Sequence, residues 1–249
     1  MAFLTLHTVS AQLKMTTVIN VILPDSVRMD VPMSERKVLY LLHGLSDDGT
    51  MWLRRSTIET EAERYGLVVV MPSVDRSFYC DGVHGQNYFT YITSELPEYM
   101  HKVFHLSLKK EDNLIAGLSM GGYGAMRAAL TFPERYRAAG SFSGVLALEP
   151  LAYQADPALA EEFPFLAAAF TELNTTTLNP INLLENARDI QLYVSCGLQD
   201  ELLICSKQFE ARASALGVPG RFHYSAGGHD WTFWNHQISD FLRFALEGN

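Results

Sequence analysis

The amino-acid sequence predicts an α/β fold with a mainly parallel central sheet and helices on both of its faces. Two observations support this prediction. Apolar runs of strand length alternate with helical patterns along the chain, and the central run is apolar on both faces. The chain has 249 residues, of which 48% are hydrophobic and 19% charged, which is enough to bury a large core. Because no linker divides the chain, we expect a single domain over residues 1–249.

The elements follow from the hydrophobic period and from the turn residues between the runs. Residues 3–23 contain two β-rich runs, "FLTLHTVSAQLKM" and "TTVINVILP", which predict an antiparallel start. The run "KVLYLLHG" (37–44) is expected to be a central strand covered on two sides. Later strands are predicted at 68–74, 113–119, 137–146, 190–197 and 221–228. Helices are predicted around 52–65, 88–105, 121–132, 201–216 and 231–246.

One interval, residues 147–188, breaks the alternation of strand and helix. It is too long for a plain crossover, and its prolines are Pro150, Pro157, Pro164 and Pro180. We therefore expect short helices that form a lid-like insertion over one end of the sheet. The alternative is a packing excursion away from any functional site.

Charge and cysteine content restrict the class of protein. The net charge of −9 and the pI near 5.3 argue against a nucleic-acid partner, which needs clustered Lys and Arg. The N-terminus "MAFLTLHTVSAQLKM" does not resemble a signal peptide, and no apolar run approaches the roughly 18 residues of a membrane span. Three widely spaced cysteines form no metal pattern and fit a reducing compartment. These features predict a soluble cytoplasmic protein without a metal.

A serine stands at a sharp corner in the stretch "NLIAGLSMGGYGAMRAAL", residues 113–130. An apolar run typical of a buried strand ends in the pattern Gly117-x-Ser119-x-Gly121, and a small-residue helix follows without a linker. Glycines on either side relieve the crowding of such a turn, and the serine hydroxyl then projects above the carboxyl end of the sheet. The pattern predicts Ser119 as a nucleophile. By itself it would also suit a serine at a helix N-cap.

A serine nucleophile needs a base, and eight histidines compete for that role. His229 in "SAGGHDWTFW" directly follows the last predicted strand, and two glycines leave its loop free to approach Ser119. In contrast, His223 lies within that strand and His236 lies inside the final predicted helix. We therefore predict His229 as the general base, the alternative being a structural loop histidine.

The base in turn needs an acid that orients it. In "YVSCGLQDELL", Asp200 comes just after the penultimate predicted strand, with Glu201 beside it. Asp200 could instead be an N-cap residue. Its position after the strand favours Asp200, and the order Ser119, Asp200, His229 is the order found in α/β-hydrolases.

Attack of a serine on a carbonyl group also needs donors for the negative charge that develops on the carbonyl oxygen. The stretch "LLHGLSDDGTMW" follows the third predicted strand, where Gly44 lets the amide of Leu45 turn inward. The amide of Met120 lies at the N-terminus of the helix after Ser119. We predict Leu45 and Met120 as the oxyanion-hole pair, and His43 as a residue that braces the loop.

Several segments together resemble a known family. They are "YLLHGLSDDGTMWLRRS", "VVVMPSVDRSFYCD", "YFTYITSELPEYM", "IAGLSMGGYGAMRAAL", "SFSGVLAL" and "SAGGHDWTFWNHQISDFL". In this order they resemble the esterase D family of α/β-hydrolases, and within it the small bacterial tributyrin esterases of the EstA type. The resemblance covers nearly the whole chain and is weakest over residues 149–187.

The resemblance implies a serine carboxylesterase that hydrolyses short-chain acyl esters, such as tributyrin and p-nitrophenyl acetate or butyrate, through an acyl-enzyme. It implies no cofactor, and it places the triad on Ser119, Asp200 and His229. Relatives include S-formylglutathione hydrolases, feruloyl and acetylxylan esterases and mycolyl acyltransferases, so these activities remain alternatives. A non-catalytic binding protein is a further alternative, although such proteins usually lack a triad member. Relatives often self-associate, which favours a homo-oligomer.

Aromatic side chains near the predicted loops are candidates for the substrate pocket. We select Trp52, Tyr79, Tyr88 and Trp231 from this group, which also contains Phe78 and Trp234. Aromatic residues at helix starts more often pack in the core than contact a ligand, so a core role is the alternative for each.

Overall fold

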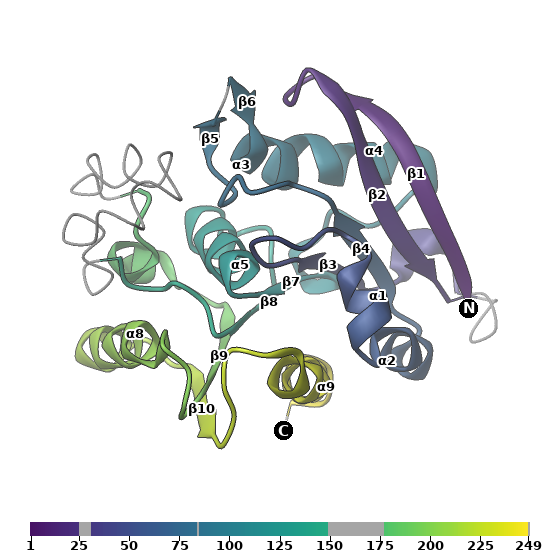
Figure 1. Ribbon diagram of the computed structural model, residues 1–249. Coiled ribbons are helices and arrows are strands. Elements are labelled where there is room, and N and C mark those ends of the chain that lie inside the picture. Colours follow the sequence, from purple (N-terminus) through teal and green to yellow (C-terminus); the bar gives the residue numbers. More distant parts are fainter. Residues whose placement is uncertain (25–30, 84, 149–176, 249) are drawn as a thin grey trace.

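A computed structural model describes residues 1–24, 31–83, 85–148 and 177–248. In this part of the chain, eight strands form one sheet in the spatial order β1-β2-β4-β3-β7-β8-β9-β10 (Figure 1). The strands are β1 (Ala2–Ser10), β2 (Met15–Leu23), β3 (Val38–Leu42), β4 (Val68–Pro72), β7 (Asn113–Leu118), β8 (Ala138–Phe142), β9 (Gln191–Gly197) and β10 (Arg221–Ser225). Strand β2 pairs antiparallel with β1 and β4, and every other pair is parallel. The predicted mainly parallel sheet with an antiparallel start is confirmed.

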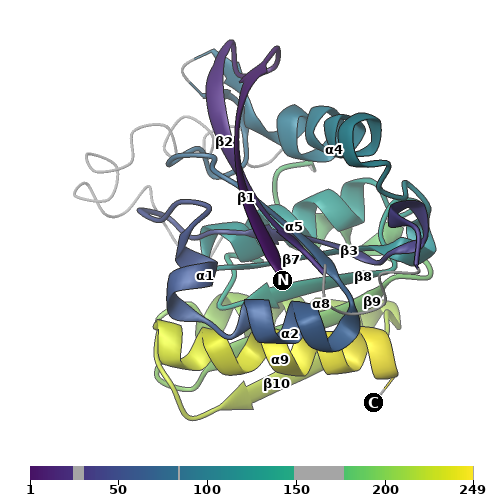
Figure 2. The ribbon, with the colours of Figure 1, turned by 90° about the vertical axis from the view of Figure 1, so that its right-hand side faces the viewer.

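The alternation of side chains along each strand divides the interior into two cores. In β3, Val38, Tyr40 and Leu42 belong to one core, whereas Leu39 and Leu41 belong to the other. All five residues are buried, because helices cover both faces of the sheet (Figures 1 and 2). The helices of the first core are α4 (Leu96–Phe104), α5 (Met120–Thr131) and α8 (Leu203–Leu216). Those of the second core are α1 (Met51–Arg55), α2 (Ile58–Tyr65) and α9 (Trp231–Glu247).

The structure differs from the sequence prediction in several boundaries. The helix predicted over 52–65 is two helices, because the Ser56 hydroxyl donates to the Trp52 carbonyl (2.5 Å) and accepts from the Ile58 amide (3.3 Å), which ends α1. The helix predicted over 88–105 contains a π-helical turn, Tyr91–Glu95, between α3 (Tyr88–Thr90) and α4. The strand predicted to reach residue 146 ends at Phe142. A short hairpin, β5 (Asp81–Val83) and β6 (Gln86–Asn87), was not predicted.

The predicted lid, residues 147–188, falls mostly on residues 149–176, which lie outside the described residues. Of the remainder, a short 3-10 segment at Pro180–Asn186 packs against α5 and α8. This segment therefore belongs to the layer of helices over the first core.

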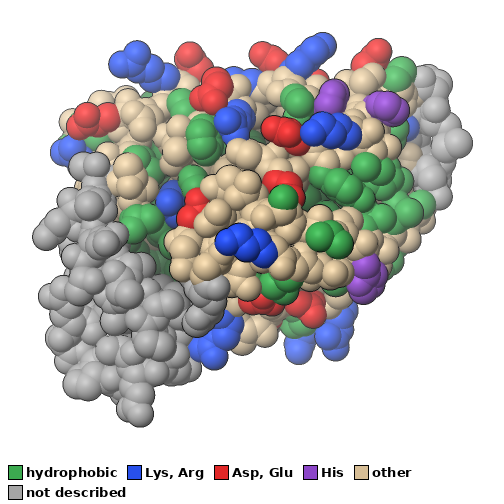
Figure 3. All heavy atoms as spheres, turned by 90° about the horizontal axis from the view of Figure 1, so that it is seen from above, with side chains coloured by type: hydrophobic (Ala, Val, Ile, Leu, Met, Phe, Trp, Pro, Cys, Tyr) green, Lys and Arg blue, Asp and Glu red, His purple; other side chains and the backbone are tan. Residues whose placement is uncertain are grey.

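Charged side chains of both signs are mixed on the face of the molecule that Figure 3 shows, which is the top of the view in Figure 1. On the described residues of this face, Lys and Arg side chains stand among Asp and Glu side chains and form no single basic patch (Figure 3). Among the described residues, no helix is long and apolar enough to cross a membrane.

Candidate active site

Ser119 occupies the tight turn between β7 and α5. Its backbone has φ 51° and ψ −117°, a conformation that L residues rarely adopt. The Ser119 amide donates to the Phe142 carbonyl of β8 (2.8 Å), which holds the turn against the neighbouring strand. A Cβ added at Gly117 would lie 2.5 Å from the backbone of Gly121, and one added at Gly121 would lie 2.7 Å from the His43 carbonyl oxygen. These close approaches explain why glycines flank the serine.

Ser119, His229 and Asp200 form one chain of hydrogen bonds. The Ser119 Oγ lies 3.0 Å from His229 Nε2, and the other ring nitrogen, Nδ1, lies 3.1 and 3.0 Å from the two carboxylate oxygens of Asp200. Ser119 follows β7, Asp200 follows β9 and His229 follows β10. The carboxyl ends of these strands meet at one edge of the parallel sheet. This geometry allows a proton to pass from the serine hydroxyl to the imidazole while the carboxylate holds the ring.

Asp200 is held by several hydrogen bonds besides the one to His229. Its Oδ1 accepts from the Leu202 amide (2.8 Å), and its carboxylate also accepts from the Ser143 hydroxyl. Burial raises the pKa of the Asp200 carboxyl, but the hydrogen bonds from His229, Ser143 and Leu202 outweigh burial and lower the pKa below its ordinary value. Asp200 is therefore an ionised carboxylate at neutral pH, as an acceptor for His229 must be.

Ser143 was not singled out from the sequence. It is fully buried after β8, has φ 53°, and accepts a hydrogen bond from Trp234 Nε1 (3.1 Å). The Trp234 ring stands edge-on to the His229 ring at 4.9 Å between centroids. Ser143 and Trp234 therefore position both partners of the Asp200–His229 pair. The only sequence signal was the stretch "SFSGVL", in which a serine follows a predicted strand.

The two acidic neighbours of the pair have other surroundings. The Asp230 side chain caps α9, where Oδ1 accepts from the amides of Thr232 (2.8 Å) and Phe233 (3.1 Å). Glu201 is exposed just before α8. Of the acidic side chains that the structure describes near His229, Asp200 is the one placed to accept from its ring.

His43 braces the loop that carries Leu45. Its Nε2 accepts the Val74 amide proton (3.0 Å), so the ring proton is on Nδ1, which donates to the Gly44 carbonyl (2.8 Å). Burial lowers the pKa of His43, which favours this neutral form. In a trans peptide the C=O and the following N–H point in opposite directions, so the amide of Leu45 is directed away from the His43 ring.

A cleft of about 750 Å³ opens over Ser119 and His229. Leu45 and Trp231 line it, while Met120 is buried as the first residue of α5. Further residues of its wall are Gly44, Arg55, Arg76, Leu118 and Trp234. The wall also contains Asp47 and Asp230, so the cleft is mixed in character, with apolar side chains, two arginines and two aspartates.

Three of the four aromatic residues selected from the sequence lie outside the cleft wall. Trp52 is fully buried, and its Nε1 donates to the Leu42 carbonyl (3.0 Å). Tyr79 is also fully buried and donates to the His43 carbonyl (2.9 Å), while Tyr88 donates to Asp75 Oδ2 (2.7 Å). Their hydroxyl or indole groups are used in holding loops, so each has the core role that was the alternative.

Trp52 nevertheless packs, from the core side, against a residue of the cleft wall. Its ring meets the Trp231 ring edge-on at 5.1 Å, and Trp231 meets Trp234 in the same way at 5.5 Å. Edge-to-face pairs of this kind stabilise a fixed arrangement of rings. The row of three indoles therefore connects the core to the imidazole of His229.

The described residues contain no group of three or more His, Cys, Asp or Glu side chains placed to hold a metal ion.

Known proteins are similar to this chain in sequence and in structure. A model of the Esterase family matches residues 10–245. An acetyl esterase of Caldicellulosiruptor saccharolyticus is 30% identical over 96% of each chain. The substrate-bound structure of FphF, a fluorophosphonate-binding serine hydrolase of Staphylococcus aureus, is 32% identical with a TM-score of 0.86, and 98% of each chain is covered.

The apoenzyme structure of the S-formylglutathione hydrolase FrmB, also from Staphylococcus aureus, is 32% identical with a TM-score of 0.83, again over 98% of each chain. These likenesses extend over the whole α/β-hydrolase fold and include the segments that carry Ser119, Asp200 and His229. The chain therefore belongs to the Esterase family, the esterase D-like group of α/β-hydrolases, and is a serine hydrolase of carboxylic esters.

Proposed function

We propose that this enzyme is a short-chain carboxylesterase of the tributyrin esterase type. The observation that carries the proposal is the position of the His229 ring. One ring nitrogen lies at hydrogen-bond distance from the Ser119 hydroxyl, and the other lies at hydrogen-bond distance from the Asp200 carboxylate. The acetyl esterase relative supports a small acyl group. Apolar side chains of Leu45, Leu118 and Trp231 in the cleft wall suit such a group next to the serine.

In the proposed mechanism, Ser119 Oγ attacks the ester carbonyl carbon while His229 Nε2 takes the hydroxyl proton. The Asp200 carboxylate stabilises the imidazolium that forms. The tetrahedral intermediate collapses, His229 gives the proton to the leaving alcohol, and an acyl-enzyme remains on Ser119. Water, deprotonated by His229, then attacks the acyl carbon and releases the carboxylic acid.

The amides of Leu45 and Met120 are the proposed donors to the oxyanion. Met120 is the first residue of α5, where helix amides have no partner within the helix. The Leu45 amide is set by the Gly44 carbonyl, which accepts from His43 Nδ1 and from the Asp47 amide (3.3 Å). His43 is thus a positioning residue for one half of the oxyanion hole.

Replacement of His43 by phenylalanine is expected to lower kcat by about 10- to 100-fold, with KM within about twofold, because a free Gly44–Leu45 peptide can rotate away from the oxyanion. His43→Gln keeps one donor and one acceptor and should recover part of the loss. The matched control is His101→Phe, since His101 Nδ1 also bonds a backbone carbonyl, that of Leu106 (2.8 Å). Equal losses in His43→Phe and His101→Phe would contradict the role.

Ser143→Ala is expected to lower kcat about tenfold, because Asp200 loses a charge-assisted hydrogen bond and Trp234 loses its acceptor. Ser195→Ala is the control: Ser195 is a buried serine of the adjacent strand, and its Oγ makes no hydrogen bond within the described residues. Steady-state kinetics on p-nitrophenyl butyrate separate the two variants. A normal kcat in Ser143→Ala would remove Ser143 from the site.

A chain-length series tests the substrate class. We expect a preference for acyl groups of about two to six carbons, with kcat/KM for p-nitrophenyl acetate and butyrate at least tenfold above that for palmitate. Tributyrin should be hydrolysed, and methyl ferulate should be a poor substrate. An optimum at the palmitoyl ester, or at methyl ferulate, would refute the short-chain assignment.

Hydrolysis of S-formylglutathione is the second candidate function. Arg55 and Arg76 line the same cleft as Ser119, and guanidinium groups favour a leaving group that carries carboxylates, as glutathione does. The S-formylglutathione hydrolase among the similar structures supports this candidate. A higher kcat/KM for S-formylglutathione than for p-nitrophenyl acetate, lost in Arg76→Ala, would favour it over the simple ester.

We further propose that the enzyme acts in the cytoplasm as a homo-oligomer. All three cysteines, Cys80, Cys196 and Cys205, are buried free thiols, which suits a reducing compartment. Strand β1 is an edge of the sheet with Phe3 and Val9 exposed, and a second copy bound there would cover both side chains. Light scattering of the purified protein tests the oligomeric state.

A further inference from the structure

The two proposed donors of the oxyanion hole belong to different elements. The Met120 amide is at the start of α5, whereas the Leu45 amide is in the loop that follows β3. Both amides can stabilise the same oxyanion only if each lies about 3 Å from it. The loop and the helix must therefore be held at a fixed separation, and a side chain that contacts both of them can do this.

Tyr79 contacts both the loop and the helix. It is fully buried, and its hydroxyl donates to the His43 carbonyl (2.9 Å). A Cβ added at Gly124 would lie 2.6 Å from Cγ and Cδ2 of the Tyr79 ring, so the ring lies directly against α5. Gly124 is one turn after Met120 on the same face of the helix. Tyr79 thus connects the helix face that begins at Met120 with the loop that carries Leu45.

The hydrogen bonds from Tyr79 and from the His43 ring hold two successive peptide groups. The His43 carbonyl accepts from Tyr79, and the Gly44 carbonyl accepts from His43 Nδ1 (2.8 Å). The Cα atom of Gly44 connects these two peptide planes, and glycine has the freest backbone of all residues. With both planes held, φ and ψ of Gly44 are fixed, and so is the direction of the Leu45 N–H.

The backbone of Tyr79 is itself held in an uncommon conformation. Phe78 and Tyr79 have φ of 50° and 51°, in the left-handed region that residues other than glycine seldom adopt. The Tyr79 amide donates to Ser77 Oγ (3.0 Å), and Arg127 Nη1 donates to the Tyr79 carbonyl (3.1 Å). Arg127 belongs to α5, and its guanidinium lies 3.8 Å from the centre of the Phe89 ring. A strained backbone persists where such contacts impose it, so α5 determines the position of Tyr79.

We propose that Tyr79 is a positioning residue of the esterase, which sets the Leu45 amide relative to the Met120 amide. This inference rests on the oxyanion hole of the proposed function. Burial raises the pKa of the Tyr79 hydroxyl, so the group keeps its proton and remains a donor. Tyr79 acts on the transition state rather than on substrate binding, because the ester oxygen becomes an anion only when Ser119 attacks.

Replacement of Tyr79 by phenylalanine keeps the ring against α5 and removes only the hydroxyl. Tyr79→Phe is expected to lower kcat for p-nitrophenyl butyrate about tenfold, with KM within about twofold of wild type. Circular dichroism checks that the variant is folded. An unchanged kcat in Tyr79→Phe would overturn the proposal.

Two matched ketones separate the oxyanion hole from substrate binding. Ser119 Oγ adds to the carbonyl carbon of butyl trifluoromethyl ketone, its proton passes to His229, and the carbonyl oxygen becomes an anion in the oxyanion hole. In Tyr79→Phe, Ki for this ketone should rise about tenfold, whereas Ki for butyl methyl ketone, which binds largely without addition, should change less than about twofold. An equal rise in both Ki values would overturn the proposal.

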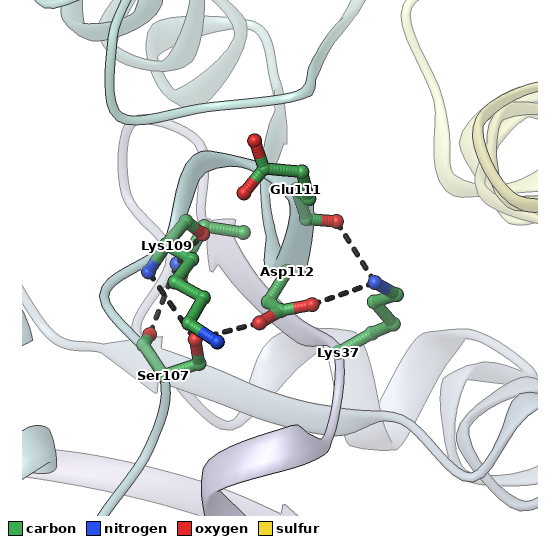
Figure 4. Close-up of polar contacts among 6 residues, drawn as sticks. Lys37, Ser107, Lys109, Glu111 and Asp112 are labelled. Atoms are coloured by element: carbon green, nitrogen blue, oxygen red, sulfur yellow. Dashed lines mark hydrogen bonds and ion pairs between the residues drawn. The ribbon is translucent and has the colours of Figure 1, made fainter.

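The matched control lies at the opposite end of β3, where another side chain holds a loop carbonyl (Figure 4). Lys37 Nζ donates to the Glu111 carbonyl (3.0 Å) and lies 2.6 Å from Asp112 Oδ1. Lys37→Met should lower the temperature of thermal unfolding but leave kcat and both Ki values within about twofold of wild type. If Lys37→Met showed the kinetic losses of Tyr79→Phe, those losses would reflect general destabilisation, and the proposal would be overturned.

A double-mutant cycle tests whether Tyr79 and His43 act on the same peptide groups. Because the loss of either bond lets Gly44 rotate, Tyr79→Phe should cost less than about threefold in kcat when His43 is already phenylalanine. A full tenfold loss in both backgrounds would contradict the shared role. The ketones need no turnover, so they test Tyr79 even if p-nitrophenyl butyrate is not hydrolysed, a result that would refute the proposed function alone.

Discussion

Ser119→Ala is expected to lower kcat for p-nitrophenyl butyrate on the order of 10⁶-fold while leaving the fold intact. The variant lacks the only hydroxyl that lies 3.0 Å from His229 Nε2 in the described structure, so no acyl-enzyme can form. The residual rate measures the contribution of the oxyanion hole and of substrate binding. Circular dichroism and thermal unfolding check that the variant is folded.

A fluorophosphonate provides an independent test of the same serine. It should label wild-type enzyme once, at Ser119, and should not label Ser119→Ala, as peptide mass spectrometry would show. Ser225→Ala, which removes a hydroxyl at the end of β10, is the control and should be labelled and active like the wild type. Labelling at any other residue, or appreciable turnover by Ser119→Ala, would reject Ser119 as the nucleophile.

Asp200→Asn is expected to lower kcat roughly 10⁴-fold at neutral pH with little change in KM. The amide keeps the shape of the side chain but removes the charge that stabilises the imidazolium, and its NH₂ group favours the wrong tautomer of His229. Because the pKa of Asp200 is lowered in the folded protein, the wild-type carboxylate is fully ionised at the pH of the assay. Single-turnover kinetics should show that acylation itself is slow.

The acidic neighbours of Asp200 and His229 are the matched controls. Asp230→Asn and Glu201→Gln should each lower kcat less than about tenfold. Asp230 caps α9, so its replacement is instead expected to affect stability, by up to about 1 kcal/mol. A collapse of activity in Asp230→Asn together with near-normal activity in Asp200→Asn would reverse the assignment of the acid.

Most elements of this fold could be predicted from local pattern. The run at 37–44 is apolar at every position because β3 is covered on both faces, and β1 alternates because one of its faces is exposed. The ends of helices were less predictable where a side chain forms a hydrogen bond with the backbone. The Ser56 hydroxyl ends α1, and no hydrophobic period shows such a bond.

The residues brought together at Ser119 were also predictable, for a local reason. A strand–turn–helix corner needs glycines at 117 and 121, and a parallel sheet places the loops after successive strands at one edge, so position in the chain indicates proximity in space. The aromatic residues carried no such constraint. Whether Trp52 or Trp231 meets the cleft depends on which ring lies in front when the two pack edge-on.

The sequence by itself therefore determined the order of strands and helices, the sharp turn at Ser119 and the chain order of Ser119, Asp200 and His229, because each depends on residues close together or on a periodic pattern. Only the tertiary structure decided that Ser143 bonds Asp200, and that Trp52 lies behind Trp231 in the core. These features depend on side chains that are distant in the chain and meet only after the strands have paired. Distances of a few tenths of an ångström then decide whether a hydrogen bond forms, and no local pattern contains them.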